Sequence, residues 1–202
     1  MEFLRTISID QRIEIITVIL SLLYVGLIAV NRRSGWWFGI AASLLSVWLF
    51  IRVNLLAESL LYVYYVVMGL YGYFHWKYGS KLNTNPPILV RSIRFHALAI
   101  TISILLTIGL AQILDLLGSS NIYADAGSTV FSFLATWMVA QRILENWLYW
   151  VAIDAFSVWL YHSRELPIYA GLMAFYSLIA VVGFFIWLKQ YRSQSTTSLA
   201  SA

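Results

Sequence analysis

The sequence predicts an all-α membrane protein with seven transmembrane helices, arranged as two parallel three-helix repeats joined by a linker helix. Three observations predict this fold: the composition, the spacing of the apolar runs and an internal repeat. Of the 202 residues, 61% are hydrophobic and only 11% are charged, whereas a typical soluble domain has about 25% charged residues. Because so little charge cannot cover a water-facing surface, we expect an integral membrane protein.

Composition also excludes several classes of function. The chain has no cysteine, which excludes disulfide scaffolds, thiol nucleophiles and cysteine metal sites. Its net charge of +4 comes from Lys and Arg in short loops between apolar runs, a pattern that sets membrane topology and does not indicate a nucleic-acid partner. The first apolar run, 13–30, is followed by Asn31, Arg32 and Arg33 without a small-residue cleavage site, so it is predicted to be a retained span and not a signal peptide.

Each transmembrane helix needs roughly 20 mostly apolar residues, and seven such segments follow one another. They are predicted at 12–31, 35–52, 56–77, 95–117, 127–142, 146–162 and 165–188. A short amphipathic lead, either interfacial or loosely ordered, precedes them at 1–10. A polar connector with two prolines follows the third, and the Ser- and Thr-rich tail from Gln190 onward is predicted to be disordered. The domains are then an N-terminal bundle with lead and connector (1–94), a linker helix and loop (95–126), and a C-terminal bundle with its tail (127–202).

Loop charge predicts the orientation. With seven spans, the loops after the first, third and fifth lie on the same side as the C-terminus. That side carries nine Lys and Arg residues, against four on the other side. The positive-inside rule therefore places the C-terminus in the cytoplasm and the N-terminus outside.

The second and third spans match the sixth and seventh when the sequence is shifted by 111 residues. Aligned pairs are Trp36 with Trp147, Ser46-Val47-Trp48-Leu49 with Ser157-Val158-Trp159-Leu160, Tyr65 with Tyr176, Gly72 with Gly183, and Trp76 with Trp187. Because tryptophan is rare, several coincident pairs without a gap indicate duplication. An odd linker helix leaves the two copies parallel across the membrane, a transporter plan in which the solute is held near the midplane between the halves.

The sixth span carries the strongest candidate site. Trp147, Trp150, Asp154 and Ser157 share one helical face, and a carboxylate at membrane depth usually faces a cavity or a partner. Asp154 is predicted to accept hydrogen bonds from ligand hydroxyls or to offset a positive charge, while the indoles stack on a flat ring or a cation. Alternatives are an interfacial position for Trp147, and a buried ion pair or a proton relay for Asp154.

Other polar and aromatic residues are weaker candidates for the substrate-binding site. On the second span the corresponding face carries Trp36 and Ser43. Tyr65 and Tyr176 either point hydroxyls into the cavity or pack between helices, and Asn146 either contacts the ligand or caps its helix. Trp76 and Trp187 end their spans and are interpreted as interfacial anchors, whereas Trp48 and Trp159 lie off the stripe and are expected to face lipid or other helices.

No enzyme is predicted. His75, His96 and His162 are not paired at metal-ligand spacing with another His or a carboxylate. No phosphate-binding loop and no nucleophile–base arrangement occurs, so we expect no metal and no cofactor. The rival class is a membrane enzyme or scaffold subunit, which would gather its polar residues at one membrane face; Asp154 and Ser43 at mid-helix argue against it.

The segment RILENWLYWVAIDAFSVWLY, with Glu145, Asn146, Trp147, Trp150 and Asp154, resembles the signature of PnuC-type nicotinamide riboside transporters. In the first repeat, WWFGIAASLLSVWLF and YYVVMGLYGYFHW resemble the N-terminal half of the same family. The resemblance covers most of 13–190 and is weak in the fourth span and the connectors. It implies a SWEET-like arrangement of seven helices, a homotrimer, a bacterial inner membrane, and uptake of nicotinamide riboside by facilitated diffusion, with trapping by a cytoplasmic kinase.

The resemblance to this family also suggests which other substrates to consider. A glutamine often stands near the position of Tyr62, and the position of Asp154 is sometimes asparagine. Members of the wider family take other B vitamins, and both nicotinamide riboside and thiamine carry a cationic ring that an acidic group would suit. We therefore predict a nicotinamide riboside importer, with a thiamine or other B-vitamin carrier and a proton-coupled carrier using Asp154 as alternatives. The predicted substrate-binding residues are Trp147, Trp150, Asp154, Asn146, Tyr65, Tyr176, Trp36 and Ser43.

Overall fold

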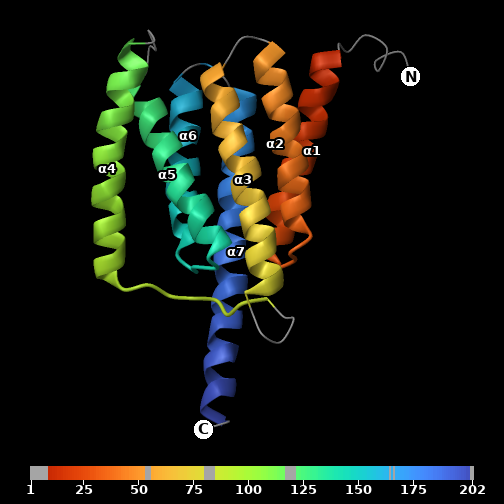
Figure 1. Ribbon diagram of the computed structural model, residues 1–202, viewed down its shortest axis with the longest axis vertical. Helices are drawn as coiled ribbons and strands as arrows, with labels where there is room; N and C mark the ends of the chain where they lie inside the picture. The colour runs from red at the N-terminus through yellow and green to blue at the C-terminus, as the bar shows by residue number, and fades with distance from the viewer. Residues whose placement is uncertain are drawn as a thin grey trace. The chain divides into compact units, whose positions relative to one another are not determined.

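The structure is a computed structural model that describes residues 9–52, 56–79, 85–116, 122–163, 165 and 167–200. Within these residues the chain forms seven α-helices (Figure 1). They are α1 (Ile9–Ala29), α2 (Gly35–Arg52), α3 (Leu56–Tyr78), α4 (Ile93–Leu116), α5 (Ile122–Ala140), α6 (Asn146–Ser163) and α7 (Pro167–Ala200). The all-helical prediction is confirmed, and each helix overlaps a predicted span.

Four of the described helices are long and apolar enough to cross a membrane. The qualifying segments are Gln11–Ala29, Gly35–Arg52, Ile93–Asp115 and Tyr169–Gln194. The three remaining helices are less apolar for identifiable reasons: α3 is rich in tyrosine, α5 contains Gly, Ser, Thr and Asp, and α6 contains Asn146 and Asp154. The helix that carries the strongest candidate residues is therefore among the least lipid-like.

The chain divides into two compact units, Met1–Pro86 and Pro87–Ala202. In the first unit α2 packs against both α1 and α3. In the second, α5 packs against α4 and α6, and α6 packs against α7. The helix predicted as a linker, α4, thus groups with the three helices that follow it.

A Schellman turn closes α1. The amide of Asn31 donates to the carbonyl of Ile28 at 2.9 Å, and the amide of Arg32 donates to the carbonyl of Leu27 at 2.8 Å. Asn31 takes the left-handed conformation, with φ 60°, which asparagine tolerates better than most residues. The side-chain amide of Asn85 donates to the Asn31 carbonyl at 2.8 Å, which ties the segment after α3 to this turn.

The turn between α5 and α6 repeats this geometry. Arg142 has φ 56°; its amide donates to Val139 at 3.0 Å, and the amide of Ile143 donates to Met138 at 2.9 Å. The connector that follows Pro87 lies along this turn, where Leu89 forms a parallel bridge to Ile143. The Leu89 amide donates to Arg142 at 2.9 Å and the Leu144 amide donates to Leu89 at 2.8 Å, so the turn is fixed from two sides.

Two sequence expectations about helix ends are wrong. The tail predicted to be disordered from Gln190 continues α7 to Ala200, because 190–200 contain neither Gly nor Pro to stop the helix and the side chain of Gln194 accepts a hydrogen bond from the Ile88 amide at 3.1 Å. Accordingly α7 extends well past α5 and α6 in Figure 1. Helix α5 begins at Ile122 and not at 127, with Asp125 in its first turn, where a carboxylate favours the helix dipole. The predicted lead, 1–10, lies almost wholly outside the described residues.

The interpretation of Trp76 and Trp187 as interfacial anchors is also wrong. Both side chains are fully buried. Trp76 meets Trp36 edge-on, with ring centroids 5.6 Å apart and an interplanar angle of 90°. Trp187 meets Trp147 in the same way, at 5.6 Å and 88°. Each pair joins the second and third helices of its three-helix set, where edge-to-face packing adds to the free energy of burial.

Candidate functional site

The start of α6 is set by the turn that precedes it. The carbonyl of Ile143 accepts a hydrogen bond from the side-chain amide of Asn146 at 2.7 Å and another from the Asn146 backbone amide at 3.2 Å. Asn146 is fully buried, and its side-chain oxygen, Oδ1, has no hydrogen-bond donor in the described part of the chain. The amide therefore both fixes the first turn of α6 and keeps a free acceptor.

A buried cation lies in the same turn. The guanidinium of Arg142 stands over the ring of Trp187, 5.4 Å from its centroid, a distance at which cation–π attraction operates. Burial lowers the pKa of Arg142 to about 10, so its side chain stays protonated at neutral pH. Arg142 thus connects the α5–α6 turn to α7 through Trp187.

Trp147 is enclosed within its own unit. Its ring lies between Trp187 and the surface of α7 at Gly183, where an added Cβ would meet ring atoms Cε2 and Cζ2 at 2.8 Å. Its indole Nε1 is buried and has no acceptor among the described residues. The interfacial reading of Trp147 is not supported by this burial, and its packing partners are those of a framework residue.

Asp154 lies in the middle of α6 and is only 6% exposed. Within the residues that the structure describes, no hydrogen bond or ion pair engages its carboxylate. Trp150 lies one helical turn before it on the same face and is half-buried, whereas Trp159, off the stripe as predicted, is 62% exposed. A buried carboxylate without a counter-ion is costly, so Asp154 is the strongest functional candidate in the chain.

The other predicted residues divide between the units. In the second unit, Tyr176 is half-buried on α7. In the first unit, Trp36 and Ser43 are buried on α2. Tyr65, on α3, packs edge-on against Tyr62 and Tyr64, with ring centroids 5.7 and 5.9 Å away.

The two three-helix sets differ at the positions of three candidate residues when the sequence is shifted by 111 residues. The first set has Gly35, Gly39 and Ser43 where the second has Asn146, Trp150 and Asp154. In the first set an added Cβ at Gly39 would meet the Tyr24 ring at 2.7 Å. The position corresponding to Tyr24 is Ala135, which is small and fully buried. The aromatic side chain of this position pair thus lies on α1 in the first set and on α6 in the second, and at the three positions compared only the second set has an amide and a carboxylate.

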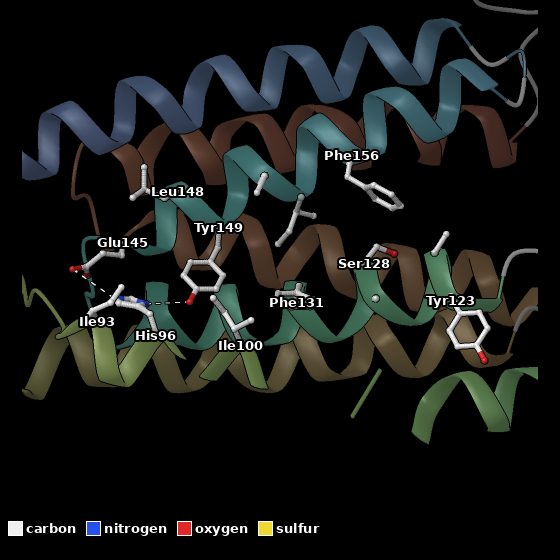
Figure 2. A pocket seen from close by; sticks show the side chains of 14 residues that line it. Ile93, His96, Ile100, Tyr123, Ser128, Phe131, Glu145, Leu148, Tyr149 and Phe156 are labelled. Atoms are coloured by element: carbon white, nitrogen blue, oxygen red, sulfur yellow. Dashed lines mark hydrogen bonds and ion pairs between the residues drawn. The ribbon is translucent and has the colours of Figure 1, made fainter. Parts of the chain in front are cut away.

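A cavity of about 630 Å³ lies on another side of α6. Residues of α4, α5 and α6 line it, and none of the eight predicted substrate-binding residues does. Figure 2 shows a polar cluster at one end of this cavity, in which His96 Nδ1 shares a hydrogen bond of 3.0 Å with the Tyr149 hydroxyl and His96 Nε2 lies 3.7 Å from Glu145 Oε1. Sequence spacing missed this cluster because α4 and α6 bring the groups together only in the fold.

The chain is similar to known proteins over most of its length. It matches the family described as "Nicotinamide mononucleotide transporter" over residues 11–189. It is 22% identical to the nicotinamide riboside transporter PnuC of Escherichia coli (strain K12), over 93% of this chain and 90% of that protein. It is 24% identical to the protein of the same name from Haemophilus influenzae, over 89% and 80%.

A solved structure, titled "Crystal structure of the Vitamin B3 transporter PnuC", has the same fold. The TM-score is 0.74 at 20% identity, and the alignment covers 91% of this chain and 83% of that one.

Proposed function

Because the chain belongs to the nicotinamide mononucleotide transporter family, we propose that it imports nicotinamide riboside across a bacterial inner membrane. The family is one of membrane transporters and not of enzymes, and the relatives from two bacteria are named nicotinamide riboside transporters. One observation carries the choice of substrate: Asp154, buried at mid-helix beside Trp150, has no counter-ion in the described residues.

The charge of the site favours the riboside over the mononucleotide. Nicotinamide riboside is a cation through its pyridinium ring, and a carboxylate at Asp154 offsets that charge as the solute leaves water. The mononucleotide adds a phosphate, which proteins usually hold with Arg or Lys. The eight predicted residues include no cation and one carboxylate, so a phosphate would meet repulsion from Asp154.

We assign the residues of the second unit different roles. Asp154 faces the pyridinium charge or the ribose hydroxyls, Trp150 stacks on the ring, and Asn146 offers its free side-chain oxygen. Trp147, which is enclosed by Gly183 and Trp187, holds α6 in place. Tyr176, and in the first unit Trp36, Ser43 and Tyr65, remain predictions as further contacts.

We also propose that the two three-helix sets are parallel repeats. Three local similarities support this proposal. The same Schellman hydrogen bonds close α1 and α5, and the residue with positive φ falls at the corresponding positions, 31 and 142. Both tryptophan pairs also pack edge-on at the same distance. Facilitated diffusion with trapping by a cytoplasmic kinase, a homotrimer, a SWEET-like arrangement of the repeats and a cytoplasmic C-terminus complete the proposal.

The test is uptake of labelled nicotinamide riboside into proteoliposomes. Asp154→Asn is expected to reduce initial uptake about tenfold or more, while Asp115→Asn, which removes an exposed carboxylate at the end of α4, leaves it unchanged. Trp150→Ala and Trp159→Ala form a second matched pair on α6, of which only the first should impair uptake. Equal uptake by all four variants would exclude the proposed site.

The alternatives have their own readouts. Thiamine or another B vitamin as the true substrate would compete with labelled nicotinamide riboside at lower concentrations than the unlabelled riboside does. A proton-coupled carrier using Asp154 would accumulate substrate against a gradient when a pH difference is imposed. A facilitator equilibrates it at the same final level with and without that difference.

A further inference from the structure

The cavity between α4, α5 and α6 has the shape of a trough. Its lining begins at Glu145, just before α6, and continues along α6 to Phe156, which corresponds to about 16 Å at about 1.5 Å per residue. Figure 2 shows Glu145 and His96 at one end, and Tyr123 and Phe156 toward the other. Between the ends the lining is mostly apolar, with Ile100 exposed within it; its one serine hydroxyl, from Ser128, donates to the Asp125 carbonyl at 3.1 Å. The length and chemistry suit an alkyl chain.

The end of the trough near the start of α4 and α6 is polar. His96 and Tyr149 share a hydrogen bond there, and His96 Nε2 lies 3.7 Å from Glu145 Oε1. The same oxygen of Glu145 accepts a hydrogen bond from the backbone amide of Arg91 at 3.1 Å. Oε1 of Glu145 therefore already has partners within the protein.

The second oxygen of Glu145 is the unexplained feature. Oε2 is buried and has no hydrogen-bond donor in the residues that the structure describes. A buried carboxylate oxygen without a donor is costly. Glu145 lines the trough, and if its side chain turns this oxygen toward the trough, a group with N–H donors and positive charge would satisfy it.

Two arginines lie near the segment whose backbone amide bonds to Glu145. Arg91 and Arg94 are exposed at the start of α4, and the Arg91 guanidinium lies over Phe95, 5.7 Å from the ring centroid. Neither arginine lines the trough, so its polar end has an acceptor of positive charge inside it and exposed guanidinium groups, which attract a phosphate, only outside it. A zwitterion of ammonium and phosphate matches this pair of charges, and an apolar tail matches the rest of the trough.

We propose that the trough binds a membrane phospholipid with a primary ammonium headgroup, such as a phosphatidylethanolamine. One acyl chain lies between α4 and α6, the ammonium donates to Glu145 Oε2, and the phosphate contacts Arg91 or Arg94. The site is separate from Asp154 and Trp150, neither of which lines the trough. A phosphatidylcholine fits the same space but has no N–H to donate, and a phosphatidylglycerol lacks the positive charge.

The first experiment uses the unmutated chain and varies only the lipid. Purified protein in detergent is titrated with phosphatidylethanolamine, its N,N-dimethyl and N,N,N-trimethyl forms, and phosphatidylglycerol, all with the same acyl chains, and bound lipid is counted by native mass spectrometry. Because the ethanolamine lipid can donate hydrogen bonds to a charged acceptor and the trimethyl lipid cannot, the protein should bind the ethanolamine lipid about tenfold more tightly. Equal affinity for all four lipids would overturn the proposal.

Variants then locate the site. Glu145→Gln keeps the size of the side chain and should abolish the preference for the ethanolamine lipid. Ala152→Phe places a ring in the trough and should reduce lipid binding, whereas Ala155→Phe, at an exposed position of α6 outside the trough, should not. If both Glu145→Gln and Ala152→Phe still bound as much lipid as the parent, with the same preference for the ethanolamine lipid, the assignment would be overturned. It would also be overturned if Ala152→Phe lost its oligomers while its lipid count stayed unchanged, because the trough would then hold a second copy of the chain.

Discussion

Replacing Gly183 with alanine is expected to destabilise the second unit. An added Cβ would stand 2.8 Å from Cε2 and Cζ2 of Trp147 and 2.9 Å from Cδ2, closer than real Cβ atoms come to carbon. The indole is rigid, and Trp187 stands edge-on against it with ring centroids 5.6 Å apart. Relief of the clash must therefore move α6 away from α7, because the ring has nowhere to turn.

The magnitude follows from two opposing terms. Alanine gains about 0.8–1.0 kcal/mol over glycine in a helix interior, while overpacking of a tight site costs about 1–3 kcal/mol. Contact with three ring atoms places Gly183→Ala toward the upper end of that cost, which leaves a net loss of about 1–2 kcal/mol. Gly72→Ala should cost more, because there an added Cβ would stand even closer to the ring atoms of Trp36.

The assay is thermal unfolding of the purified variants, with Gly171→Ala as the control on the same helix. Nothing lies within 4 Å of an added Cβ at Gly171, so that variant should be equal to or slightly more stable than the parent. For a chain of this length 1 kcal/mol corresponds to about 2–4 °C, so Gly183→Ala should melt about 2–8 °C below the parent. If Gly183→Ala melted at or above the temperature of the parent, the Trp147 ring would not lie against α7 at Gly183.

Three further predictions test the turns and helix ends. Arg142→Lys should lower stability by about 1–2 kcal/mol in thermal unfolding, because the flat guanidinium over Trp187 is lost while the positive charge remains; unchanged stability would mean that the ring contact contributes nothing. Gln194→Ala should speed hydrogen exchange of the Ile88 amide about two- to tenfold, because it removes a hydrogen bond worth about 0.5–1.5 kcal/mol. The Leu89 amide, bonded to the Arg142 carbonyl, is the internal reference. Exchange at Ile88 as slow as in the parent would argue against the α7 contact. Asn31→Ala should cost about 1 kcal/mol in chemical denaturation, because it places alanine at φ 60°, whereas Asn31→Gly should be better tolerated.

The sequence predicts the helices well where apolar runs are bounded by strong signals. The bounds of α2, which follows the polar turn at Arg32–Ser34, are the same in the prediction and the structure. The end of α7 could not be predicted in this way, since a Ser- and Thr-rich segment is polar enough for disorder yet contains no residue that stops a helix. Its contact through Gln194 to Ile88 is a tertiary interaction between distant parts of the chain, which local composition does not report.

The burial of Asp154 could be expected from the sequence, whereas the packing of the residues around it could not. Helical periodicity placed Asp154 on a buried face of α6, since periodicity depends only on local geometry. The enclosure of Trp147 depends on Gly183 and Trp187 of α7, and the burial of Trp76 depends on Trp36 of α2. The sequence shows only that these tryptophans lie at span ends, a position typical of interfacial residues. The His96, Tyr149 and Glu145 cluster joins two helices separated by α5 in the chain, and no spacing in the sequence indicates it.

The central claim is that the Asp154 carboxylate recognises a positively charged vitamin. It is tested most directly by measuring equilibrium binding of nicotinamide riboside and of its reduced dihydro form, which has nearly the same shape and no ring charge, to the parent protein and to Asp154→Asn. Two unit charges about 4 Å apart interact by about 4 kcal/mol at an effective dielectric constant of about 20, and desolvation offsets much of this. We expect the parent to prefer the charged form by about tenfold and Asp154→Asn to lose that preference; the same preference in both proteins would contradict the claim.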